Sequence, residues 1–242
     1  MQVLLLLATA VLLMGVGFYA GWNSITFIGI WPPVQQHVVD NFHYLYYYND
    51  TRTWNNTRWL GVPAQKLPLD LWVYQEMLWE LRPDFLIETG TFKGGSALYF
   101  ASLFDLIGKG KVITNDIEHP EGLPVHDRIE YLLGSSTSPE ILSEVKSRID
   151  GAATVMVVLD SDHSAAHVAN EIQLYSPLVT VGSYMIVEDT NLSGHPVVPS
   201  MQAGPMEALE PFLARTADFV SDRDREKYFL SQNPRGYVRR IR

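Results

Sequence analysis

The chain has 242 residues and a formal net charge of -9 at pH 7, and 47% of its residues are hydrophobic. This is the composition of a folded protein. The acidic balance argues against a nucleic-acid partner, because binding to phosphates requires a surplus of Lys and Arg. The sequence contains no cysteine, which excludes disulfides, thiolate nucleophiles and Cys-ligated zinc.

Residues 1–22 carry no charged side chain. At ~1.5 Å per residue such a run is long enough to cross the hydrocarbon core of a bilayer. We expect an uncleaved membrane anchor, with a cleaved signal peptide and a buried helix as alternatives. Because the basic residues Arg52, Arg58 and Lys66 follow the run and none precedes it, the main domain is expected in the cytoplasm. A secreted or luminal location is the alternative.

Residues 23–66 are rich in aromatic residues and Asn and are expected to form an arm ahead of the main domain, residues 67–242. Aromatic side chains bury well against any available surface. We therefore expect the arm to pack across the main domain. The alternative is that it forms an aromatic wall of a substrate pocket.

From Pro68 onward, helical and strand patterns alternate along the chain. The patterns predict helices over residues 69–83, 94–108, 138–150, 163–179 and 204–216. They predict strands over residues 84–90, 111–117, 128–136, 153–162 and 182–190, and a last pair of strands within 218–242. This alternation predicts an α/β, Rossmann-like domain with a parallel sheet and helices on both faces.

Acidic residues follow four of the predicted strands: Glu88, Asp116, Asp160 and the pair Glu188–Asp189. A lone acid at such a position often only caps the next helix. In open parallel sheets, however, ligands bind beyond the carboxyl ends of the strands. We therefore expect the four positions to surround one crevice.

The stretch IETGTFKGGSALYF, residues 87–100, has the form of a strand, a glycine-rich loop and a helix. A dinucleotide-binding loop requires Gly where Phe92 stands, and a P-loop requires Lys where Ser96 stands. The loop therefore does not match either phosphate-binding pattern. A glycine turn of purely structural use is the alternative to any ligand site.

The remaining pattern is an acid followed by two spaced glycines, Glu88, Gly90 and Gly94. It allows the backbone to approach a ligand that carries no phosphate and offers a carboxylate to a cationic or hydroxylated group. Asp116, at the end of the next strand, is suited to a ribose diol. Both features favour S-adenosylmethionine as the ligand.

A second group of polar residues comprises Asp160, Asp162 and His163 in LDSDH, with Glu188 and Asp189 in VEDT. Oxygen ligands without cysteine favour Mg²⁺, or else Mn²⁺ or Ca²⁺. A divalent ion there could hold the oxygens of a substrate diol, and His163 could act as general base. The alternatives are surface carboxylates without a metal and a histidine that only bonds backbone at a helix entry.

These motifs together resemble the cephalosporin hydroxylase / rhamnosyl O-methyltransferase family of class I S-adenosylmethionine-dependent enzymes. The resembling stretches run from Trp59 to Arg240 in the family's order and include IETGTFKGGS, VITNDIEHP, VVLDSDHSAAHV and YMIVEDTNLSGHPV. The resemblance implies a seven-stranded sheet whose last strand is antiparallel. It also implies Mg²⁺-assisted methyl transfer to a hydroxyl of a small molecule or of a sugar in a glycolipid or polysaccharide.

The resemblance further implies roles for individual residues. Cofactor contacts are expected at Glu88, Gly90, Thr91, Gly94, Gly95, Ser96, Asp116, Ser135 and Ser136. Metal ligands are expected at Glu188, Asp189 and either Asp160 or Asp162. From the chemistry of the residues themselves, the catalytic residues are expected to be His163 and Asp160.

Two other functions remain open from the sequence. One is a non-catalytic partner of an oxidative tailoring enzyme that keeps the same fold, and the other is a secreted or luminal glycan-binding module. The sequence leaves the oligomeric state open, with a homo-oligomer among the alternatives.

Overall fold

The computed structural model describes residues 32–149, 151 and 153–242. The expected anchor, residues 1–22, and the first part of the arm therefore lie outside the described residues. In the part of the chain that is described, no helix is both long and apolar enough to cross a membrane. The chain divides into two compact units, Met1–Phe42 and His43–Arg242, and helix α2 (Pro32–Tyr48) continues across this boundary.

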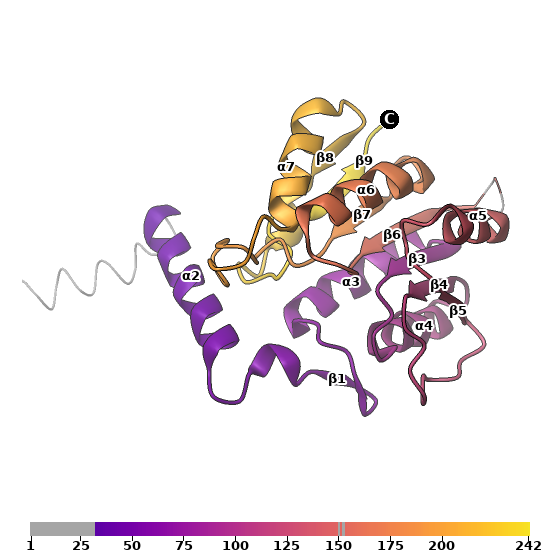
Figure 1. The fold of residues 1–242 in the computed structure, drawn as a ribbon, viewed down its shortest axis with the longest axis horizontal. Coiled ribbons are helices and arrows are strands. Elements are labelled where there is room, and N and C mark those ends of the chain that lie inside the picture. Colours follow the sequence, from indigo (N-terminus) through magenta and orange to yellow (C-terminus); the bar gives the residue numbers. More distant parts are fainter. Residues whose placement is uncertain (1–31, 150, 152) are drawn as a thin grey trace, which may run out of the picture. The chain divides into compact units, whose positions relative to one another are not determined.

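The second unit contains every other described element (Figure 1). The remainder of the arm contributes the short helix η1 (Thr53–Asn55) and an antiparallel ribbon of β1 (Arg58–Trp59) and β2 (Val62–Pro63). The helices that follow are α3 (Pro68–Leu81), α4 (Gly95–Ile107), α5 (Pro139–Arg148), α6 (Ala165–Tyr175), η2 (Ser176–Leu178), α7 (Pro205–Arg215) and η3 (Arg223–Glu226). The strands are β3 (Phe85–Thr89), β4 (Lys111–Asp116), β5 (Ile129–Leu133), β6 (Val155–Leu159), β7 (Tyr184–Val187), β8 (Phe219–Ser221) and β9 (Tyr237–Arg240).

The main sheet has seven strands in the order β5-β4-β3-β6-β7-β9-β8. Strands β3 to β7 pair in parallel, whereas β9 is antiparallel to both β7 and β8. The predicted mostly parallel sheet with an antiparallel last strand is therefore confirmed.

Helices cover both faces of this sheet (Figure 1). On one face, Tyr74 of α3 and Phe100 of α4 join a core that includes one side of the strands. On the other face, residues of α5, α6 and α7 form a second core. Because both of its faces are covered, all five residues of β6 are buried, which explains its continuous apolar sequence.

Local sequence explains where several elements begin and end. Helix α5 begins after Ser138, whose Oγ accepts a hydrogen bond of 3.2 Å from the backbone N–H of Ile141. Helix α6 is shorter than the predicted 163–179, because Pro177 lies in a short 3₁₀ turn that follows Tyr175. Helix α2 was not predicted at all, since its aromatic residues form no clear apolar stripe.

The chain order of the strands places a switch point at the centre of the sheet. The chain runs outward from β3 through β4 to β5 and then returns to β6, which lies on the other side of β3. The loops after β3 and β6 therefore leave the sheet in opposite directions, and a crevice opens between them.

Candidate functional site

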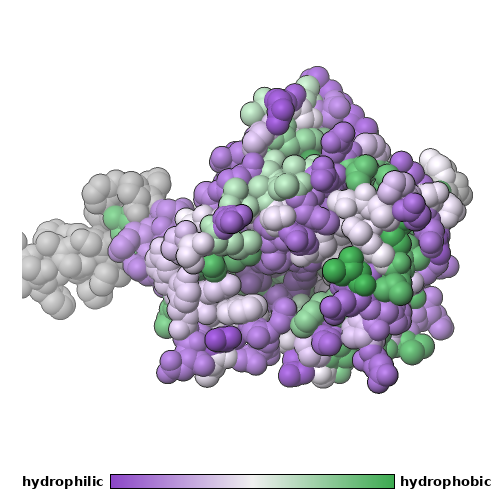
Figure 2. Space-filling view, in the orientation of Figure 1, coloured by the Kyte–Doolittle hydropathy of each residue, from purple (hydrophilic) through white to green (hydrophobic). Residues whose placement is uncertain are grey.

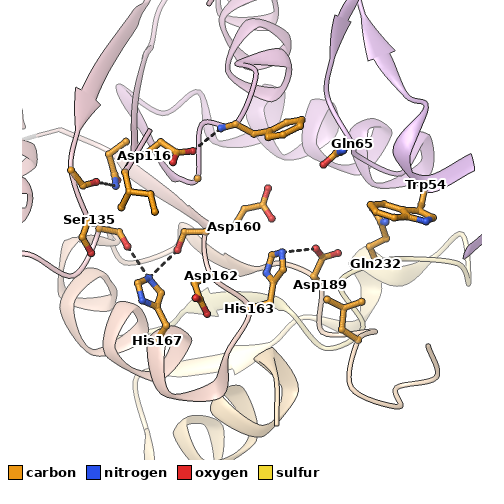
Figure 3. Close-up of a pocket in the computed structure, with 18 of the residues that line it drawn as sticks. Trp54, Gln65, Asp116, Ser135, Asp160, Asp162, His163, His167, Asp189 and Gln232 are labelled. Atoms are coloured by element: carbon orange, nitrogen blue, oxygen red, sulfur yellow. Dashed lines mark hydrogen bonds and ion pairs between the residues drawn. The ribbon is translucent and has the colours of Figure 1, made fainter. Parts of the chain in front are cut away.

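A pocket of about 680 Å³ lies at the carboxyl ends of these strands. Figure 2 shows the face on which it opens as a largely polar surface with a hollow near its centre. The loops after β3, β4 and β5 line one end, and residues of the arm and of the C-terminal loop line the other. Acidic residues and His163 lie between the two ends (Figure 3).

At the first end, Gly90 allows the backbone after β3 to pass very close to the chain after β6. Gly90 has a φ of +86°, and a Cβ there would lie 1.9 Å from the carbonyl oxygen of Asp160. Its N–H donates a 2.8 Å hydrogen bond to the carbonyl oxygen of Asn115. Only glycine fits this position, so the turn is specified by the sequence.

Asp116, directly at the end of β4, is fixed at the rim of the same end. Its Oδ2 accepts a 2.8 Å hydrogen bond from the N–H of Phe92, and its Oδ1 accepts one of 3.1 Å from the N–H of Glu118. Ser135 and Ser136, after β5, complete this end of the pocket. The two hydrogen bonds to Asp116 thus orient its carboxylate toward a ligand in this end of the pocket.

Glu88 lies behind the loop and does not line the pocket. Its Oε2 accepts a 2.7 Å hydrogen bond from the hydroxyl of Thr114, whereas among the described residues its Oε1 has no partner. Burial raises the pKa of Glu88 to about 7, against the opposing effects of Lys66, Ser96 and Thr114. Four other residues with expected cofactor contacts also lie outside the lining, namely Thr91, Gly94, Gly95 and Ser96.

The centre of the pocket is formed by Asp160, His163 and Asp189. One potential ligand atom from each of the three lies within 4.8 Å of the others. The Nε2 of His163 is 3.2 Å from the Oδ2 of Asp189. Burial raises the pKa of Asp189, and the attraction of His163 opposes this shift. The loops after β6 and β7 thus bring two carboxylates and an imidazole together.

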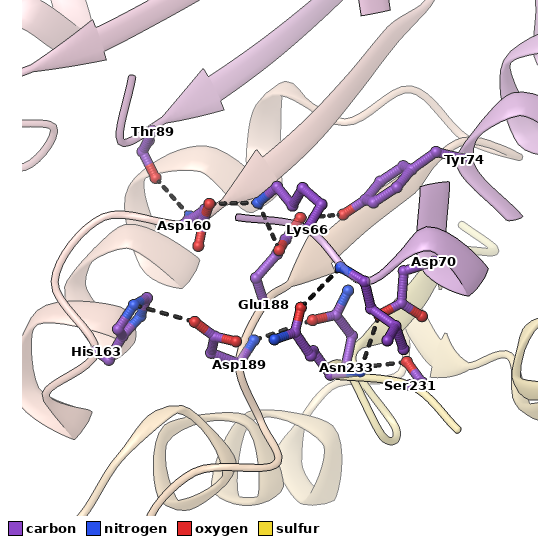
Figure 4. A network of polar contacts seen from close by, with 12 residues as sticks. Lys66, Asp70, Tyr74, Thr89, Asp160, His163, Glu188, Asp189, Ser231 and Asn233 are labelled. Atoms are coloured by element: carbon purple, nitrogen blue, oxygen red, sulfur yellow. Dashed lines mark hydrogen bonds and ion pairs between the residues drawn. The ribbon is translucent and has the colours of Figure 1, made fainter. Parts of the chain in front are cut away.

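A buried lysine from the arm contacts the acids at this centre from the interior of the protein (Figure 4). The Nζ of Lys66 donates to the Oδ2 of Asp160 and lies 2.6 Å from the Oε2 of Glu188. The hydroxyl of Tyr74 donates to the Oε1 of Glu188. Burial lowers the pKa of Lys66, but the attraction of Asp160, Glu188 and Glu88 outweighs it and raises the pKa overall. Lys66 is therefore an ammonium group.

The acids that the sequence offered as metal ligands differ in their surroundings. Both oxygens of Glu188 face buried partners, and Glu188 does not line the pocket. Asp162 does line the pocket, but its Oδ1 accepts a 2.7 Å hydrogen bond from the N–H of Ser164 at the start of α6. Hydrogen bonds from Ser164 lower the pKa of Asp162. In geometry, Asp160 rather than Asp162 lies with His163 and Asp189.

His167, which the sequence analysis did not single out, also lines the pocket. Its Nε2 lies 3.1 Å from the hydroxyl of Ser136 and 3.0 Å from that of Ser161. It is also 3.5 Å from the Oε1 of the buried Glu171, whose hydrogen bond raises the pKa of His167. His167 thus connects α6 to the loop after β5.

The far end of the pocket is lined by side chains that sequence reasoning did not assign individually. Tyr47 and Trp54 stack with ring centroids 5.1 Å apart and an interplanar angle of 8°. Gln65 and Gln232 lie beside them. An aromatic wall was the less favoured alternative for the arm. The sequence did contain one signal for Lys66: it is the only charged residue in the stretch PAQKLP, residues 63–68, which indicates a lysine in a largely uncharged segment.

The residues present fit the two ligands that the sequence suggested. Among the described lining residues there is no Lys or Arg, which suits a ligand without phosphates. The close approach of the backbone at Gly90 also fits a ligand bound along the loop. Asp160 and Asp189 offer the hard oxygen donors that Mg²⁺ prefers.

The mostly parallel seven-stranded sheet, with a glycine turn after β3 and an acid after β4, defines the class of the protein. It is the fold of class I S-adenosylmethionine-dependent methyltransferases. The family model described as "Rhamnosyl O-methyltransferase/CmcI" matches residues 51–241. The chain belongs to this family.

Proteins of known function agree with this assignment. The rhamnosyl O-methyltransferase of Mycobacterium leprae is 40% identical over 197 residues, which cover 79% of this chain and 85% of that protein. The protein of the same name from Mycobacterium tuberculosis is 38% identical and covers 83% of this chain and 84% of its own length. The chain is therefore an S-adenosylmethionine-dependent O-methyltransferase, and the non-catalytic alternative is not supported.

Solved structures of CmcI share the fold. A form with magnesium and S-adenosylmethionine superimposes with a TM-score of 0.59 at 25% identity, and it covers 81% of this chain and 79% of that one. An apo form gives a TM-score of 0.60 at 24% identity with the same coverage.

Proposed function

We propose that this enzyme transfers the methyl group of S-adenosylmethionine to a hydroxyl of a rhamnosyl sugar in a glycolipid or polysaccharide, with Mg²⁺ as metal cofactor. The sugar is suggested by the relatives, which are rhamnosyl O-methyltransferases. The metal and the donor are suggested by the related CmcI structure, which contains both. The observation that carries the proposal is the convergence of Asp160, His163 and Asp189 midway along the pocket.

The loop end of the pocket would bind the methyl donor. Gly90 lets the donor lie against the backbone, and Asp116 accepts hydrogen bonds from the ribose hydroxyls. Ser135 and Ser136 face the same space. Glu88 would act from behind the loop, where its carboxylate, bonded to Thr114, holds the loop in place for the donor. Orienting the donor sulfonium and the acceptor oxygen in line supplies much of the rate acceleration.

Asp160 and Asp189 would hold the metal. A bound Mg²⁺ would lower the pKa of the acceptor hydroxyl and orient its oxygen. Lys66 would keep Asp160 in place, and Glu188, whose Oε2 lies 2.6 Å from the Nζ of Lys66, would hold Lys66 in turn. Among the expected metal ligands, Asp162 instead stabilises the start of α6.

His163 would act as general base. Its Nε2 is close to Asp189, which orients the ring and stabilises the imidazolium that forms. The proton leaves the acceptor hydroxyl for this imidazole as the oxygen attacks the methyl carbon. The methyl–sulfur bond breaks as the oxygen–methyl bond forms, its electron pair returns to the sulfur, and S-adenosylhomocysteine leaves as the product.

The choice between Asp160 and Asp162 gives a direct test. We expect Asp160→Asn to lower kcat on the order of 10²-fold, because it removes a charge that stabilises the reacting centre. Asp162→Asn should stay within a few-fold of wild type. Methyl transfer to a rhamnoside and Mg²⁺ affinity by calorimetry would be measured for both. Equal, small effects in the two variants would contradict the proposed metal site.

The uncharged residues 1–22 support attachment to a membrane with the catalytic unit in the cytoplasm. This part of the proposal rests on the sequence, since these residues lie outside the described structure. Extraction of the full chain from membranes by detergent, but not by alkaline carbonate, would agree with it. Release by carbonate would contradict it.

A further inference from the structure

The end of the pocket beyond Asp160, His163 and Asp189 differs from the rest of the pocket in the charge of its lining residues. Its lining residues are Tyr47, Trp54, Gln65, Leu192 and Gln232, and all of them are uncharged. In Figure 3, Trp54, Gln65 and Gln232 lie on the far side of His163 and Asp189 from Asp116. Methyl transfer at the centre requires the acceptor to approach from the side opposite the donor. An uncharged lining suits a neutral acceptor at this end.

The two aromatic rings are held as a rigid pair. Tyr47 lies in the last turn of α2 and Trp54 in η1, and the turn between them is closed by Asn49. The Nδ2 of Asn49 donates to the carbonyl oxygen of Tyr46 (2.9 Å) and to the hydroxyl of Thr53 (2.8 Å). This turn holds two half-buried rings stacked on one another, so that each supports the other and the pair can offer an outer ring face to the pocket. A preformed flat apolar surface costs little conformational entropy when a ligand binds.

The two glutamines beside the rings complete the site with polar groups. Gln65 donates its Nε2 to Asn55, which leaves its Oε1 as an acceptor. The Oε1 of Gln232 accepts a 3.0 Å hydrogen bond from the N–H of Leu67, which leaves its Nε2 as a donor. One acceptor and one donor beside an aromatic surface match a ring with an apolar face and hydroxyls at its edge.

We propose that Tyr47 and Trp54 form a stacking platform for the sugar ring of the acceptor, with Gln65 and Gln232 bonding its hydroxyls. This inference rests on the proposed function, because it places the acceptor of that reaction. It identifies the ligand class as a neutral sugar, such as a 6-deoxyhexose, whose ring lies on the aromatic surface.

The test replaces the ring while keeping its apolar character. In Trp54→Leu the stacking surface is lost, and KM for methyl α-L-rhamnoside should rise about tenfold, as expected for a loss of ~1.4 kcal/mol. Trp54→Phe should raise it only about twofold, since a ring remains. Tyr47→Leu removes the other ring and gives an independent measurement if Trp54→Leu folds poorly. Binding of the same rhamnoside would be followed by saturation-transfer NMR, which needs no turnover.

Trp79→Leu is the matched control, because Trp79 is exposed and lies outside the pocket. It should leave KM unchanged. In all variants the affinity for S-adenosylhomocysteine should stay within about twofold of wild type, since the platform lies away from the donor end.

The outcomes separate the two proposals. If Trp54→Leu and Tyr47→Leu both bind the rhamnoside as tightly as the wild-type protein does, the platform is overturned while the proposed reaction stands. A wild-type protein that binds no rhamnoside at millimolar concentration would also overturn it. Failure to bind S-adenosylhomocysteine would instead contradict the proposed function.

Discussion

At the residue scale, the ammonium group of Lys66 decides whether the acidic centre can exist without a ligand. Its side chain is 3% exposed and contacts the carboxylates of Asp160 and Glu188. Buried carboxylates without a counter-charge are costly, and removal of one member of a buried ion pair leaves the other uncompensated. Lys66 thus contributes an internal positive charge to a site that also suits a metal ion.

Replacement of this lysine should be strongly destabilising. We expect Lys66→Met to lower the free energy of unfolding by ~3–5 kcal/mol, measured by urea denaturation, because Asp160 and Glu188 lose their shared cation. Added Mg²⁺ should restore part of this loss, since it binds the folded state beside Asp160. Lys109→Met is the control: its 2.7 Å ion pair with Asp84 is largely exposed, so the cost should be at most about 1 kcal/mol. Equal losses in the two variants would contradict the account.

The buried Asp70 gives stability a pH dependence. It accepts 2.8 Å hydrogen bonds from the N–H of Gln232 and the hydroxyl of Tyr237, and burial raises its pKa to about 7. The folded state therefore holds this proton more tightly than the unfolded state. The resulting stabilisation is complete below the unfolded pKa and is lost as the pH rises through about 7, at a cost of about 4 kcal/mol.

Asp70→Asn should flatten this dependence. The variant has no proton to lose at this position, so its free energy of unfolding should fall less than that of wild type between about pH 5 and about pH 8. Denaturant titrations at the two pH values measure the difference. A slope identical to wild type would show that Asp70 does not titrate in this range. Burial also raises the pKa of Glu88, which should leave a residual slope in both proteins.

At the element scale, the connection from β3 to α4 determines how close the two central loops can be. Gly90 and Gly108 have nearly the same φ, +86° and +84°, but only Gly90 has backbone where a Cβ would lie. Gly108→Ala should therefore cost only the strain of a left-handed conformation, ~1–2 kcal/mol. Gly90→Ala should cost clearly more and should also weaken S-adenosylhomocysteine binding. Thermal melts of Gly90→Ala and Gly108→Ala measure the loss of stability, and calorimetry measures the binding of S-adenosylhomocysteine. Equal melting temperatures for the two variants would contradict the expected difference.

Elements with local signals were predictable from the sequence. Strand β6 is a continuous apolar run, α5 has a Ser–Pro start, and the glycine loop has its own spacing. The acids after these strands could also be placed at one edge, because parallel strands end on the same side of a sheet. The burial of Glu88 behind the loop was not predictable, since it depends on the packing of Thr114 and its neighbours.

Other parts of the site depend on contacts between distant segments. Lys66 and Asp160 are 94 positions apart in the chain, and Leu67 and Gln232 are 165 apart. Neither contact leaves a periodic pattern in the sequence. Helix α2 was missed for a related reason, because its aromatic residues fit the helical period poorly.

At the scale of the whole molecule, the second unit forms one pocket with three successive regions. The strand loops line one end, the acids and His163 lie at the centre, and the arm supplies an aromatic end; in the proposed reaction the first end would bind the donor and the centre would hold the reacting groups. The order of the strands explains this arrangement, because β3 and β6 are paired neighbours but the loops that follow them diverge, which leaves a crevice beyond their carboxyl ends. The arm adds Lys66 below the centre and the rings beyond it.

The central claim is that this pocket joins a methyl donor to a sugar hydroxyl in a metal-dependent reaction. The most direct measurement is NMR of the product formed from S-adenosylmethionine with an isotopically labelled methyl group and a rhamnosyl glycolipid, with Mg²⁺ or with EDTA. We predict a labelled methyl ether on a rhamnose oxygen with Mg²⁺, and its loss with EDTA. Equal product in EDTA, or a label on any atom other than a sugar oxygen, would contradict the account.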